Sequence, residues 1–239
     1  MAHKRKQWFY GSNSVRRSVR QQEDGNTPEL KMYDQSVLDT LIGTGTSWSG
    51  ADMDPSSNTL FSPNLGVDMG QRIGRRCAVV GLDMNGFIDC NDQVLAVGAD
   101  PAAICRIIVF QDTQTKGVQA LGNLVMEAQT ADAFHVITAF PSRDAIGRFI
   151  ILKDMVYVMQ NPAFSSLGSS GVTYDQQGIA KWFSFRIEFD EPVIVHFDAS
   201  DAGSVADVLD NSFHVMASNS SSGLSPRLTY TTRVYYYDF

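Results

Sequence analysis

The feature that most constrains the fold is a strict alternation of apolar and polar residues over Lys181–Phe189. Every second position is apolar: Phe183, Phe185, Ile187 and Phe189. Because side chains on a strand point alternately to the two faces of a sheet, this pattern predicts a strand with one face in a core. Asp190-Glu191-Pro192 follows and predicts a turn into a second short strand over Val193–Asp198.

Further strand-like stretches recur along the chain, separated by loops rich in Gly, Ser and Asn. They cover 36–41, a part of Gly70–Gly86, 104–112, 148–159, 211–217 and 227–238. The stretch 104–112 is apolar on both faces, which predicts a place in the middle of a packed sheet. One short helix is expected near 121–131. About eight strands with almost no helix predict an all-β protein, most simply one antiparallel β-sandwich.

Long loops and an arginine cluster raise the question of partners. The excursion over 113–147 and the loop over 160–178 are long enough to suggest contacts with another subunit or a place on the surface. Arg72, Arg75 and Arg76 open the strand within Gly70–Gly86. They are expected either to form ion pairs with the acidic body or to contact a nucleic acid.

The charge of the chain is unevenly distributed. Residues 1–22 carry six cations and no acid, which leaves 13 basic residues against 26 acidic ones in the remainder. The cations form two clusters: Lys4, Arg5 and Lys6, then Arg16, Arg17 and Arg20. We therefore expect a flexible basic arm over 1–28 ahead of a body over 29–239, with a polyanion as the partner of the arm alone.

The arm combines cations with aromatic rings. Trp8 and Tyr10 lie between the two clusters and are candidates for stacking on unpaired bases, while the cations meet phosphates. A disordered solubilising tail is the alternative interpretation. The two clusters also fit the spacing of a bipartite nuclear-import signal, which would bring the chain into a host nucleus.

Catalytic and metal-binding patterns are not found in the sequence. It has no phosphate-binding glycine loop, no nucleophile elbow and no zinc-protease motif, so we expect neither an enzyme nor a cofactor. The four histidines lack metal-ligand spacing, and Asp198, Asp201, Asp207 and Asp210 are expected to form a solvated loop rather than an ion site. Three cysteines without CxxC spacing indicate reduced, buried thiols, and neither secretion nor membrane insertion is expected.

Five short stretches in a fixed order resemble the capsid proteins of small circular single-stranded DNA viruses that encode a replication initiator. The chain also resembles the related capsids of plant satellite viruses. The stretches are Glu29-Leu-Lys-Met-Tyr-Asp34, Gly70-Gln-Arg-Ile-Gly-Arg-Arg76, Arg106-Ile-Ile-Val-Phe-Gln-Asp112 with Thr115-Lys-Gly117, Gly147-Arg-Phe-Ile-Ile-Leu-Lys-Asp154, and Thr232-Arg-Val-Tyr-Tyr-Tyr-Asp238.

The resemblance implies one eight-stranded antiparallel jelly roll behind the basic arm. It also implies self-assembly into an icosahedral T=1 shell of about sixty copies. The virion would enclose a single-stranded genome, expected to be DNA, and a host receptor is unknown. Six cations on each of about sixty arms would neutralise about 360 phosphates, fewer than a kilobase genome carries, so bound cations or other inner-surface residues must contribute. One alternative is a lectin-like jelly-roll binding module with an incidental tail, whose ligand contacts would be Trp48, Trp182 or the acidic loop. The other is a satellite-virus capsid that packages RNA.

Overall fold

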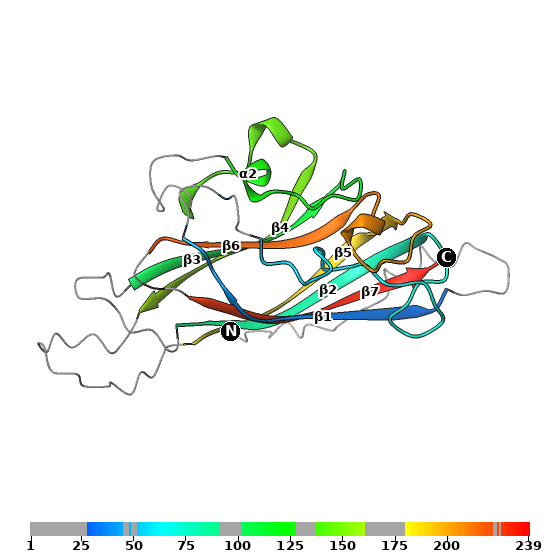
Figure 1. Cartoon of the computed structure of the whole chain (residues 1–239), viewed down its shortest axis with the longest axis horizontal. Coiled ribbons are helices and arrows are strands. Elements are labelled where there is room, and N and C mark those ends of the chain that lie inside the picture. The colour runs from blue at the N-terminus through cyan, green and yellow to red at the C-terminus, as the bar shows by residue number, and fades with distance from the viewer. Residues whose placement is uncertain are drawn as a thin grey trace, which may run out of the picture.

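Two antiparallel sheets lie face to face in a computed structural model that describes residues 28–44, 48, 52–90, 102–127, 137–160, 180–221, 224 and 226–239 (Figure 1). One sheet has the order β1-β7-β2-β5 and the other β4-β3-β6. The strands are β1 (Leu30–Leu41), β2 (Arg76–Asp89), β3 (Ala102–Asp112), β4 (Phe149–Gln160), β5 (Lys181–His196), β6 (Ser212–Asn219) and β7 (Arg227–Asp238). Short helical turns among the described residues include α2 (Gly122–Val125), η2 (Arg143–Ala145) and η3 (Val205–Asp207). The predicted all-β sandwich is confirmed.

The described residues contain seven strands where eight were expected, because β5 is continuous. The predicted turn at Asp190-Glu191-Pro192 is wrong: these residues lie in a bulge. The pairing of β5 with β2 steps from Glu188–Gly81 to Val193–Val79, so β5 has four residues where β2 has one. β5 is an edge strand. Proline is tolerated at edges and bulges because its missing N–H breaks no ladder bond there.

The main core lies between the two sheets. Phe183 is buried there and Phe185, Ile187 and Phe189 pack against it, as the alternation predicted. β3 lies between β4 and β6, which confirms the expectation drawn from its two apolar faces. Three apolar anchors in an otherwise polar stretch, Trp48, Leu60 and Phe61, are fully buried.

A second apolar cluster covers the outer face of the three-stranded sheet. It joins residues of β3 and β6 to the segment that follows β3, and its members are Trp48, Ile108, Phe110, Ala120, Val125, Met126, Ala139 and Met216. Figure 1 shows α2 and its neighbouring segments on this side of the molecule. The described part of the 113–147 excursion therefore packs on its own subunit, and its helix is shorter than predicted.

Arg106 fixes this cover to the sheet. Its guanidinium donates two hydrogen bonds to the Asp154 carboxylate (2.9 and 2.6 Å). It donates two more to the carbonyl oxygens of Ile137 and Ala139 (2.7 and 2.8 Å). Since charge-assisted, bidentate bonds are the strong ones, Arg106 links β3, β4 and the excursion into one unit.

An irregular segment over 52–60 runs beside β6, at the free edge of the three-stranded sheet. The amide of Met53 donates to the Val215 carbonyl (3.0 Å), and the amide of Leu60 donates to the Phe213 carbonyl (2.8 Å). An isolated antiparallel bridge also joins Asp52 to β6. The segment thus occupies the position of a further strand without the regular ladder of one.

The cysteines and the helices complete the fold. Cys77, Cys90 and Cys105 are free and buried, as expected. Burial raises the pKa of Cys77 to about 12 and that of Cys90 to about 11, so both thiols stay protonated at neutral pH. Within the described parts of the chain, no helix has the length and apolar character needed to span a bilayer.

Candidate functional site

The predicted nucleic-acid contacts lie outside the described residues and stay predictions. They are the arm cations Lys4, Arg5, Lys6, Arg16, Arg17 and Arg20 and the aromatic residues Trp8 and Tyr10. The first residue that the structure describes is Pro28, two residues before β1. Residues 1–28 lead directly into β1, an edge strand of the four-stranded sheet, so the predicted arm joins the body at that sheet.

Arg72 is a structural residue. Neither of its two expected roles, an ion pair with the acidic body or a contact with a nucleic acid, applies to it. Its side chain is fully buried and precedes β2. The guanidinium donates to the carbonyl oxygens of Pro63 (3.0 Å), Gly74 (2.7 Å) and Ser200 (2.8 Å). It also lies 4.6 Å from the ring centre of Phe197. Five donors in a rigid fork suit this position, where the segment before β2 meets the loop after β5.

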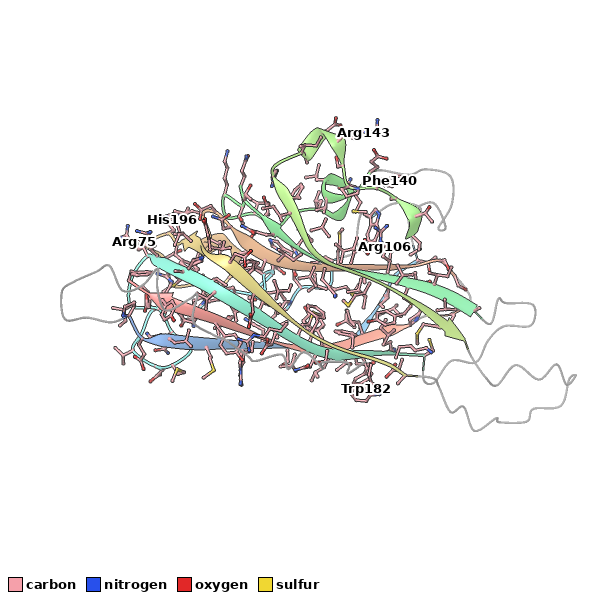
Figure 2. The ribbon with its side chains drawn as sticks, turned by 180° about the vertical axis from the view of Figure 1, so that it is seen from behind. Arg75, Arg106, Phe140, Arg143, Trp182 and His196 are labelled. Carbon is pink, nitrogen blue, oxygen red and sulfur yellow. The ribbon has the colours of Figure 1, made fainter. Side chains whose placement is uncertain are left out.

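The other two arginines of the cluster are exposed. Arg75 lies near His196 at one end of the sandwich (Figure 2). Arg76 begins β2, and its guanidinium lies 5.6 Å from the ring centre of Phe239. The stretch Gly70–Arg76 is therefore a tightly packed entry to β2 rather than a row of three equivalent cations.

The acidic loop after β5 uses its carboxylates as internal hydrogen-bond acceptors. Asp207 is buried and accepts from the Ser200 hydroxyl and from the Gly203 amide. Asp201 accepts from the Leu65 amide (2.6 Å). In the described residues no three His, Cys, Asp or Glu side chains are arranged to hold a metal ion. These hydrogen bonds hold the loop in place, so it is not the freely solvated loop that was expected.

A buried chain of four polar side chains, which was not predicted, ties three segments together. Asp54 bonds the His214 Nδ1 (2.6 Å), the His214 Nε2 bonds the Ser212 hydroxyl (2.6 Å), and that hydroxyl bonds Thr115 (2.6 Å). The residue types are those of a hydrolase triad, but Ser212 and His214 are each only 1% exposed. A substrate therefore has no access to the Ser212 oxygen, and the chain connects the 52–60 segment to β6 and the turn after β3.

The outer face of the four-stranded sheet, named here the open face, carries balanced charge. Its arginines lie beside carboxylates: Arg233 with Asp34 (2.6 Å), Arg186 with Glu188 (2.9 Å) and Arg227 with Asp39. The hydrogen bonds from Arg233 lower the pKa of the Asp34 carboxyl, so this pair is ionised at neutral pH. A polyanion consequently meets no excess of positive charge on these three pairs.

A hollow of about 510 Å³ opens on the open face across β5, β2 and β7. The outward side chains that line it are Asn85, Phe87, Trp182, Ser184, Thr229 and Thr231, and we name it the Trp182 hollow. Trp182 is 74% exposed. Its ring centre lies 4.8 Å from that of Phe87 at a tilt of 43°. Figure 2 shows Trp182 on the opposite side of the molecule from Phe140 and Arg143.

Sequence reasoning had named Trp182 only as a candidate ligand contact of the lectin-like alternative. Its exposure was foreseeable from its outward parity in the alternation, but Phe87 lies on another strand and was not foreseen as its partner. No protein-family model matches the chain, and no curated protein shows significant sequence similarity to it. The candidate surface therefore stands on its geometry: an open face, an arm that joins the same sheet, and an exposed aromatic pair.

Proposed function

We propose that the chain is a viral capsid protein that assembles into an icosahedral shell and packages a single-stranded genome, expected to be DNA, through its basic arm. The observation that carries this proposal is the strand order. A jelly roll has eight antiparallel strands in two sheets of four, and it is the fold of many viral capsids. The order β1-β7-β2-β5 opposite β4-β3-β6 needs only one more strand, next to β6, to complete this pattern.

The 52–60 segment supplies that strand in the proposed fold. It follows β1 in the chain and lies antiparallel to β6, where the eighth strand of a jelly roll is required. The sheets then have four members each, and the chain crosses from one sheet to the other as in two interlocked Greek keys. Its irregular pairing explains why only seven strands meet the hydrogen-bond pattern of a ladder.

The stretches that carry the resemblance lie mainly in this scaffold. Glu29–Asp34 enters β1, Arg106–Asp112 belongs to β3, Gly147–Asp154 enters β4 and Thr232–Asp238 belongs to β7. These matches fall on strands that build the core. They therefore support a shared architecture more strongly than matches in loops would.

The separation of charge supports the packaging role. The arm carries six cations without an acid, and the remaining chain carries twice as many acidic as basic residues. Neutralising phosphates with Lys and Arg supplies most of the affinity of sequence-independent nucleic-acid binding. An acidic body limits that binding to the arm, which lets a strand fill the interior without coating the outer surface.

Nuclease protection tests this proposal. The full chain is mixed with circular single-stranded DNA of about one kilobase, or with RNA of equal length, and each mixture is then treated with the matching nuclease. Protection of the DNA supports the proposal. Protection of the RNA alone would assign the chain to the satellite-virus alternative, and protection of neither would contradict a packaging function.

A further inference from the structure

The two sheets differ in what covers their outer faces. The second apolar cluster, anchored by Arg106, covers the three-stranded sheet. Among the described residues no comparable cluster forms on the open face. The arm also joins the body at this sheet, through Leu30 of β1, which pairs with Tyr237 at the end away from Trp182. Under the proposed function, a strand bound by the arm is held at high local concentration beside the open face.

Trp182 packs on its cross-strand partner Phe87, but the described residues leave most of its surface uncovered. It occupies an outward site of an edge strand, with about three quarters of its surface exposed. Large exposed apolar side chains, especially when grouped, mark interaction sites. Here Phe87 on the neighbouring strand supplies the second ring, and the surrounding Ser184, Thr229 and Thr231 supply hydroxyl groups.

We propose that Trp182 and Phe87 form a stacking site for an unpaired nucleobase of the packaged strand. This inference rests on the proposed function and adds a second kind of contact to it. Exposed aromatic side chains on a four-stranded sheet are an established way to stack successive bases of a single strand. Stacking of this kind tolerates any sequence, as a packaged genome requires.

The chemistry of the hollow suits a base rather than a phosphate. None of its lining residues is charged, and its volume is within the range of small-ligand sites. The Ser184 hydroxyl donates to the side-chain oxygen of Asn85 (2.6 Å), which leaves the Asn85 NH2 group as a donor toward the edge of a base. The arm cations then neutralise phosphates, and the hollow binds bases.

Stacking would add affinity that does not depend on the limited positive charge of the arms. About 360 phosphates would be neutralised by the arms of a sixty-copy shell, which leaves most of a kilobase strand without protein cations. Bound cations can neutralise the remaining phosphates, and stacking can then hold the bases without further protein charge. A sugar ring can also stack on tryptophan, but a sugar site would have no reason to lie on the sheet that the arm joins.

The test compares variants of the full chain, at a concentration where sedimentation shows unassembled subunits. The probes are a labelled 20-residue oligothymidylate and a 20-residue abasic strand with the same phosphates. We expect Trp182→Ala to weaken binding of the oligothymidylate about 5- to 100-fold and to leave binding of the abasic strand unchanged. Trp182→Phe should retain most of the affinity. Phe140→Ala, which removes a ring of 72% exposure elsewhere, should change neither.

A second variant controls for the possibility that Trp182→Ala misfolds. Thr231→Glu keeps both rings and puts a carboxylate at the rim of the hollow, so it should also weaken binding of the oligothymidylate. Equal affinity of wild type and Trp182→Ala for the oligothymidylate would overturn the inference. So would loss of glycan binding in Trp182→Ala with unchanged oligothymidylate binding, which would assign the hollow to a sugar. If the wild-type chain binds neither strand, the proposed function itself fails.

Discussion

Replacement of Arg72 by alanine is expected to lower the free energy of unfolding by about 4 kcal/mol. The side chain is fully buried, and three carbonyl oxygens depend on its donors: those of Pro63, Gly74 and Ser200. Alanine would leave these acceptors without partners and open a cavity against Phe197. Chemical denaturation of the unassembled chain measures the effect.

Arg75 provides a matched control three residues away. Its side chain is exposed, so Arg75→Ala should change the free energy of unfolding by no more than about 0.5 kcal/mol. Arg72→Lys should fall between the two, because one ammonium group does not reach three carbonyls as the planar guanidinium does. Equal stability of Arg72→Ala and Arg75→Ala would show that the buried fork is not a structural element.

Removal of residues 1–22 is expected to change the salt dependence of nucleic-acid binding more than any substitution in the body. A single strand releases about 0.7 counterions for each neutralised phosphate, so the loss of six cations should flatten the slope of log K against log salt by about four. Titrations of a labelled oligonucleotide at several salt concentrations measure this slope.

A full-length chain with all six arm cations changed to glutamine is the control for arm length. It should behave like the truncated chain if charge is the cause. Trp182→Ala should leave the slope unchanged, since stacking releases no counterions. A slope that stays the same after truncation would place the phosphate contacts in the body and contradict the assignment of the arm.

Much of the fold follows from local pattern. Alternation over Lys181–Phe189 predicted which side chains enter the core, and the two apolar faces of 104–112 predicted a central strand. The error at Asp190-Glu191-Pro192 has a physical cause. A proline ends most strands, but whether it lies at a sheet edge, where it is tolerated, depends on the order of strands in space.

The site was harder to predict because it depends on tertiary contacts. Arg72 and Arg75 are the same residue type only three positions apart, and only the fold buries one and exposes the other. The pairing of Asp54 with His214 joins residues 160 positions apart. The Trp182 hollow combines three strands from distant parts of the chain. The periodicity of one segment does not predict its contacts with distant segments. Charge can be counted along the sequence alone, and this count predicted the basic arm.

Electron microscopy of the purified full-length chain, with its mass measured by sedimentation, tests the central claim most directly. The account predicts uniform round particles of about sixty copies, which for a chain of 26.3 kDa corresponds to about 1.6 MDa. A species that remains a 26.3 kDa monomer at high concentration, with no particles in the images, would contradict the capsid assignment.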